Sequence, residues 1–262
     1  MEKKILYLLT CVGLCWSSCT NEVDEFIGNV EPSTRSVSTA LNANLASLFT
    51  GGAPTLTSAE IKEVNDAYAK MTSINCYRNI DEAVRNKTSY AGTIFLDDTY
   101  ASAYFRKGSL AFPPYGILAS SMEHEFIHMY QRDVQSKKVD TDKEKRDTGM
   151  MEFELAFYQG IIRYIHAGYS WTFKGEDGDP SYQSLWTSGL TDPSLIPQYE
   201  REFQTYVASI CANGKPTSID INEFVKWSNI FGEYSRGYSG KGYKFGNYDY
   251  GTSCINSLLK LY

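Results

Sequence analysis

Apolar residues recur at helical spacing in four segments of this chain, and the pattern predicts a helix in each of them. In the first segment, Ile61, Val64 and Tyr68 share one face, and Ser58 is placed to cap the N-terminus. The four segments cover residues 58–72, 149–166, 196–211 and 221–231. Helices therefore dominate the C-terminal part of the expected fold.

Three short apolar and aromatic runs lie between the first and second of these helices, and they predict strands. The runs cover residues 93–96, 102–105 and 109–112, and Pro113 and Pro114 end the last of them. We therefore expect an α+β fold in which a small antiparallel sheet is followed by a mainly helical part.

A further helix is expected directly after the sheet. Ser120 or Ser121 can cap its N-terminus, and Glu123 places negative charge in its first turn. Residues 131–133 are polar and should lead out to solvent. The apolar residues that should face the core are Met122, Phe126, Ile127 and Met129.

The first residues of the chain resemble a bacterial lipoprotein signal. Lys3 and Lys4 precede an apolar run at residues 5–14, which is too short to span a bilayer, and small residues lead up to Cys19. Cleavage before Cys19 and lipidation of its thiol would anchor an exported chain to a membrane. An ordinary secretory peptide with a coincidental cysteine is the alternative.

The polar residues after Cys19 are typical of a flexible tether. We expect the signal at residues 1–18, the tether at 19–45 and the folded domain at 46–262. Acidic residues early in the tether resemble the export signals of surface lipoproteins of some Gram-negative bacteria. The expected location is therefore the outer membrane, with exposure at the cell surface as a further possibility.

Composition limits the partners and the cross-links of this domain. The formal net charge of -6 and the lack of a basic stripe argue against a nucleic-acid partner. Cys76, Cys211 and Cys254 remain after the signal and the lipidated residue are set aside. Three cysteines allow at most one disulfide and one free thiol, and the pairing stays open.

The segment that begins at His124 reads H-E-x-x-H and contains two of the three histidines of the chain. Residues four apart on a helix lie on one face, so His124 and His128 can bind one Zn²⁺. The intervening Glu125 can then act as general base toward a water at the open position of the metal. The alternative is that both histidines are ordinary core or surface residues whose hydrogen bonds are satisfied and that they bind no metal.

With this motif the sequence resembles the gluzincin metallopeptidases, in which a glutamate from a second helix completes the site. The resemblance covers about forty residues and rests on His124, Glu125, His128 and one of Glu152 and Glu154. It implies a zincin-like fold, with an antiparallel edge strand beside the zinc helix where an extended peptide can add. The metzincin pattern is excluded because no glycine and third histidine follow at its spacing.

Either Glu152 or Glu154 could be the third metal ligand. The family pattern favours Glu152, whereas the large apolar residues on the face of Glu154 favour that residue by burial. We prefer Glu152 and keep Glu154 as the alternative. His166 is a weaker candidate, because a histidine at the end of a helix more often binds carbonyl groups.

These residues predict a zinc-dependent hydrolase, with a protein or peptide as the expected substrate. Zinc would activate water and polarise the scissile carbonyl, while Glu125 passes a proton to the leaving amine. The alternative is a non-catalytic surface lipoprotein that binds a glycan or a host protein through the tyrosine-rich residues 234–250. The sequence does not define the cleavage specificity, the oxyanion-stabilising residue or the oligomeric state.

Overall fold

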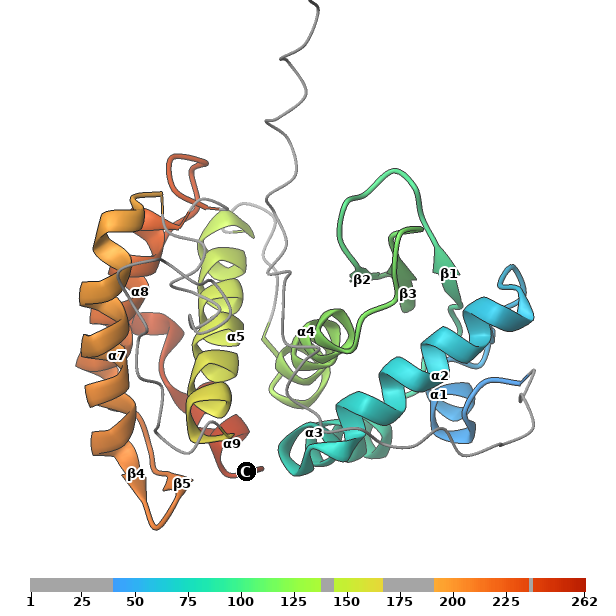
Figure 1. Cartoon of the computed structure of the whole chain (residues 1–262), viewed down its shortest axis with the longest axis horizontal. Coiled ribbons are helices and arrows are strands. Elements are labelled where there is room, and N and C mark those ends of the chain that lie inside the picture. Colours follow the sequence, from blue (N-terminus) through green and yellow to red (C-terminus); the bar gives the residue numbers. More distant parts are fainter. Residues whose placement is uncertain (1–39, 138–143, 167–190, 236–237) are drawn as a thin grey trace, which may run out of the picture.

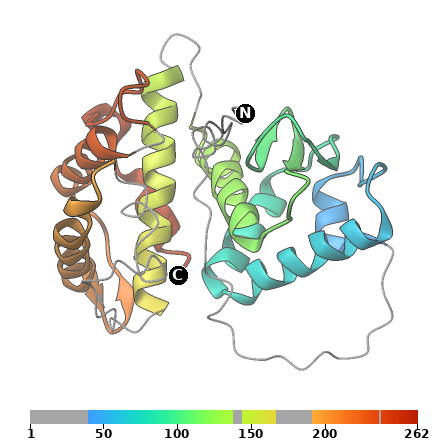
Figure 2. The same ribbon diagram turned by 45° about the horizontal axis from the view of Figure 1, so that its top comes forward.

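The computed structural model describes residues 40–137, 144–166, 191–235 and 238–262, and these form two groups of elements that lie side by side (Figures 1 and 2). The predicted signal, Cys19 and most of the predicted tether lie outside the described residues. The first group consists of α1 (Ala43–Leu48), α2 (Ser58–Ser73), α3 (Asn75–Lys87), β1 (Ile94–Leu96), β2 (Tyr104–Arg106), β3 (Ser109–Phe112), α4 (Ala119–Met129) and the π-helical turn η1 (Tyr130–Val134).

The second group is almost entirely helical and contains the remaining elements. They are α5 (Glu144–His166), η3 (Pro193–Leu195), α7 (Ile196–Ile210), β4 (Cys211–Ala212), β5 (Lys215–Pro216), α8 (Ile221–Tyr234), η4 (Tyr248–Tyr250) and α9 (Ser253–Leu259). Figure 1 shows α5 on the inner side of this group, facing α4 of the first. The α+β class and the mainly helical C-terminal part are therefore as predicted.

The three-stranded sheet is mixed, which corrects the expectation of a purely antiparallel one. β3 lies in the centre, with β1 parallel to it on one side and β2 antiparallel on the other. Lys107 and Gly108 connect β2 to β3 with φ values of 51° and 78°. Two positive φ angles give a tight hairpin whose twist matches the strands. In the described sheet β2 pairs with β3 alone, so it is an edge strand.

The starts of two helices differ from the sequence expectations. Thr57, not Ser58, caps α2, in a reciprocal capping box with Glu60. α4 has Leu118 at its N-cap without a side-chain hydrogen bond, so Ser120 and Ser121 lie inside the helix. Glu123 consequently lies beyond the first turn, where it is half-buried and forms a hydrogen bond with Tyr77 instead of stabilising the N-terminus.

Three helices were not predicted, namely α1, α3 and α9. α1 begins before the predicted start of the domain at residue 46, and its Leu45 is fully buried. α3 is rich in polar residues, yet its Ile80 and Val84 are completely buried against the first group. No disulfide joins the cysteines of the described part, and none of its helices is long and apolar enough to span a membrane.

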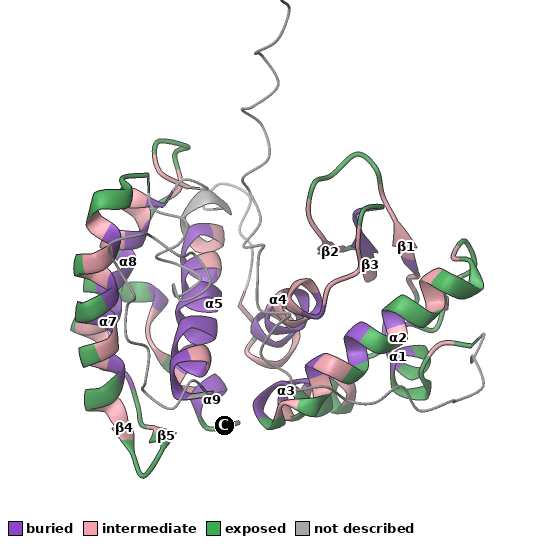
Figure 3. Cartoon of the chain, in the orientation of Figure 1, coloured by how far each residue is buried: buried purple, intermediate pink, exposed green. Residues whose placement is uncertain are grey.

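α5 is buried along most of its length, as the purple ribbon in Figure 3 shows. On the side toward the second group, Phe153 and Phe157 pack against Phe224 of α8, with ring centroids 5.0 to 6.1 Å apart. On its other side α5 contacts α4. A polar residue in such a helix needs a partner, because an unpaired buried carboxylate is strongly unfavourable.

Candidate metal centre

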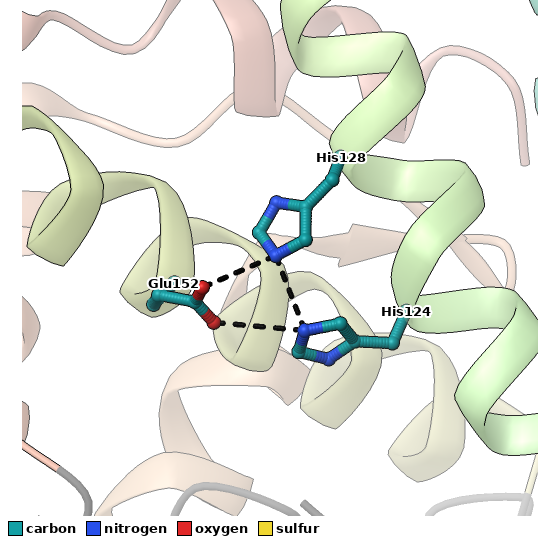
Figure 4. A group of neighbouring side chains, drawn as sticks. All are labelled: His124, His128 and Glu152. Carbon is teal, nitrogen blue, oxygen red and sulfur yellow. Dashed lines mark hydrogen bonds and ion pairs between the residues drawn. The ribbon is translucent and has the colours of Figure 1, made fainter. Parts of the chain in front are cut away.

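α4 presents the two histidines of the motif on one face, directed toward α5 (Figure 4). The Nε2 atoms of His124 and His128 lie 3.1 Å apart. The two side chains keep 21% and 15% of their surface exposed. Both rings therefore direct a nitrogen at one point that remains open to solvent.

Glu152 on α5 supplies the third group. Its Oε1 lies 3.2 Å from Nε2 of His128, and its Oε2 lies 3.6 Å from Nε2 of His124 (Figure 4). Tyr238, from the tyrosine-rich segment, also forms a hydrogen bond with this carboxylate. The sequence preference for Glu152 thus coincides with the residue that the fold brings to both histidines.

These separations fit a tetrahedral metal. Zinc bonds of about 2.0 to 2.2 Å place neighbouring ligand atoms of a tetrahedron about 3.3 Å apart. The three observed distances, 3.1, 3.2 and 3.6 Å, lie close to that edge length. The group of His124, His128 and Glu152 could therefore hold a metal ion, with three corners of a tetrahedron supplied by protein.

The charges of the group favour a cation between the three side chains. Burial opposes the charged form of His128, but the neighbouring Glu152 carboxylate outweighs it and raises the pKa of His128 to about 9. Burial and the charge of His128 lower the pKa of His124 to about 4. Burial works against the charged form of Glu152, yet His128 lowers its pKa to about 2. Positive charge is thus stabilised beside Glu152.

Glu125 lies next to this group without being part of it. Its Oε1 is 3.9 Å from Nε2 of His124, and the backbone amide of Phe105 in β2 donates to its carboxylate. Only 5% of its side-chain surface is exposed, and burial raises the pKa of Glu125 to about 8. The edge strand therefore fixes the carboxylate that the motif predicts as general base.

Glu154 faces away from the histidines. Its Oε2 accepts hydrogen bonds from Gln131 Nε2 at 2.8 Å and from the hydroxyl of Tyr250 at 2.9 Å. Residues two apart on a helix point in nearly opposite directions, since each residue turns the helix by about 100°. Glu154 is the more buried of the two glutamates, but burial here reflects a structural network and not contact with the histidines.

Gln131 contacts the candidate site although its sequence position did not predict this, because residues 131–133 were expected to lead into solvent. Its side chain is fully buried, and its Oε1 accepts a hydrogen bond from Nδ1 of His128 at 2.8 Å. Its Nε2 donates to Glu154 and, at 3.0 Å, to the backbone oxygen of Met151. Its position three residues after His128 could have indicated this contact, because residues three apart share a helix face.

His166 does not join the group. It is the last residue of α5, fourteen positions after Glu152, and its side chain lies outside the described residues. At 1.5 Å per residue its backbone lies about 20 Å along the helix from Glu152. The same helix therefore separates this weaker candidate from the histidines of α4.

Comparison with protein families, with curated proteins and with solved structures found no match for this chain. The gluzincin resemblance consequently rests on the motif and on the geometry of the residues around it.

The two glutamates of α5 should differ in their effect on metal binding. We expect Glu152→Gln to weaken Zn²⁺ binding more than 100-fold. Loss of a residue that contacts a ligand without binding the metal itself typically weakens binding by about 10 to 100-fold, and loss of a ligand should exceed this. Glu154→Gln, which has the same shape, should stay within that smaller range. Competition with a chromophoric chelator measures both affinities, and the reverse ranking would assign the ligand to Glu154.

Gln131 should orient His128 for a metal. We expect Gln131→Met to lower the affinity for Co²⁺ by about 10 to 100-fold, because His128 loses the partner of its Nδ1. Gln135→Met is the matched control, since Gln135 follows in the same turn and bonds only to Tyr130 among the described side chains. Visible absorption of Co²⁺ reports both affinity and geometry. Equal binding by the two variants would contradict this role.

Proposed function

We propose that this protein is a zinc-dependent hydrolase that cleaves amide bonds in proteins or peptides. The observation that carries the proposal is the tetrahedral spacing of His124, His128 and Glu152 directly beside the buried Glu125. Two imidazoles and one carboxylate are a donor set that catalytic zinc uses. Structural zinc sites usually close with a fourth protein ligand, whereas the group formed by the described residues has three members.

A bound zinc ion would lower the pKa of a coordinated water toward neutrality and polarise the carbonyl of the substrate. Glu125 takes a proton from the attacking water and delivers it to the leaving nitrogen, which needs a proton before it can depart as an amine. The backbone amide of Phe105 holds Glu125 in place during both transfers. His124, His128 and Glu152 would hold the ion beside this general base.

The edge strand β2 supports an extended peptide as substrate. β2 pairs with β3 on one side only, and its amide at Phe105 reaches Glu125 on the other. Because Glu125 already accepts from that amide, an extended chain would pair with this edge beside Phe105 and not at its N–H group. β2 is three residues long, so it could pair with only a short stretch of a substrate chain next to the general base.

We further propose that the protein is an exported lipoprotein, anchored through Cys19 to the outer membrane. The support is the lysine-rich start, the short apolar run and the small residues before the cysteine. An anchored hydrolase outside the cell encounters polymeric substrates. This location agrees with protein or peptide as the substrate class.

Glu125→Gln should remove hydrolysis while the metal stays bound. The amide cannot accept the proton of water, and loss of a general base typically costs about 10² to 10⁴-fold in rate. Cleavage of a proteome-derived peptide mixture, followed by mass spectrometry, measures activity, and elemental analysis measures zinc. Glu123→Gln is the control on the same helix. Full activity of Glu125→Gln, or a zinc-free active protein, would reject the proposal.

Cys19→Ala should release the protein from membranes without changing its folding. The residue lies outside the described domain, so its loss removes the lipid attachment alone. Cell fractionation measures the location, and circular dichroism measures folding. Cys211→Ala, which alters a partly buried cysteine of the domain, serves as control. Unchanged membrane association of Cys19→Ala would exclude the lipid anchor.

A further inference from the structure

A cavity of about 520 Å³ opens beside the candidate metal centre, and His128 and Glu152 form part of its wall. Its volume falls in the range of pockets that bind small molecules or a few amino-acid side chains. Phe105 and Met151 give the wall an apolar portion. A group bound there would lie next to the atoms that are proposed to react.

Two cationic side chains, Arg132 and Lys137, line the same cavity. The guanidinium of Arg132 lies over the ring of Phe105, 4.9 Å from its centroid. Lys137 donates through Nζ to the backbone oxygen of Tyr250 at 2.8 Å and lies 3.8 Å from the centroid of that ring. Within the described part of the chain, neither cation forms an ion pair with a carboxylate.

The acidic groups of the cavity have other partners. Asp133 accepts a hydrogen bond from the hydroxyl of Tyr90 at 2.5 Å, and Glu152 belongs to the metal group. A divalent ion bound by that group would add further positive charge to the same space. In the cavity wall Arg132 and Lys137 balance Asp133 and Glu152, so a bound metal ion would make this space net positive in a chain whose formal charge is -6.

We propose that Arg132 and Lys137 bind a carboxylate of the substrate, so that the enzyme acts on amide bonds close to a carboxylate. The assignment rests on the proposed function for its link to cleavage. Arginine and lysine form charge-assisted hydrogen bonds with carboxylates, and arginine can bind both oxygens at once. Phe105 and Met151 contact the apolar part of the bound residue. The carboxylate belongs either to an acidic side chain or to the C-terminus of a peptide.

Binding can be measured separately from catalysis with the Zn²⁺-loaded Glu125→Gln variant. Three dansyl-labelled, alanine-rich hexapeptides serve as probes: one with a central glutamate and an amidated C-terminus, one with a central glutamine and an amidated C-terminus, and one with a central glutamine and a free C-terminus. We expect one of the two peptides with a carboxylate to bind at least about tenfold more tightly than the neutral peptide. Which of them does so identifies the source of the carboxylate.

The two cations are then tested by Arg132→Gln and Lys137→Gln in the same background, with Lys87→Gln, an exposed lysine of α3, as matched control. Each cavity variant should reduce the preference for the carboxylate peptide, and the control should preserve it. Arg132→Glu should favour a peptide with a central lysine instead. Equal affinity for all three peptides, or a preference that survives both cavity substitutions, would overturn the assignment.

The outcome separates this inference from the proposed function. Tight binding of the carboxylate peptide without hydrolysis of any peptide by the Zn²⁺-loaded wild-type protein would reject the hydrolase and keep the binding site. Hydrolysis of neutral and acidic peptides at equal rates, together with equal binding, would keep the hydrolase and reject the carboxylate site.

Discussion

Two carboxylates in the buried helix α5 determine how the two groups of elements meet. An unpaired carboxylate in an apolar interior is so unfavourable that each must find a partner. Glu152 meets the histidines of α4, and Glu154 meets Gln131 of η1 and Tyr250 of η4. The polar contacts thus link α4 and η1 to the C-terminal helices. The candidate site lies at this junction, where Glu152 faces both histidines and Oε2 of Glu154 accepts two hydrogen bonds.

The same contacts fix the chemistry of His128. Its Nδ1 donates to the side-chain oxygen of Gln131, and its Nε2 is directed toward Glu152 and His124. The amide of Gln131 cannot turn over, because its nitrogen is held by Glu154 and by the backbone of Met151. By accepting a hydrogen bond from Gln131, Glu154 therefore helps to orient the ring of His128 without contacting it.

The site was predictable from sequence where its geometry is local, and it was not where it depends on tertiary contacts. The spacing of His124 and His128 fixes their shared face, and the spacing of Glu152 and Glu154 fixes opposite faces. Which glutamate meets the histidines depends on the rotation of α5 against α4, which no short pattern contains. Gln131 was misjudged for the same reason, as were the parallel pairing of β1 and the helix α3.

The direction of α4 and η1 connects the metal group to the adjacent cavity. His124, His128 and Arg132 follow at intervals of four residues, so a helical chain carries all three along one stripe. The π-helical turn η1 is wider than an α-helical one, and its hydrogen bond runs from Gln135 to Tyr130 at 3.0 Å. This turn directs Gln131 into the core while Arg132 reaches the cavity wall. One continuous segment therefore supplies both histidines of the candidate site, the amide that contacts one of them, and a cation in the wall of the adjacent cavity.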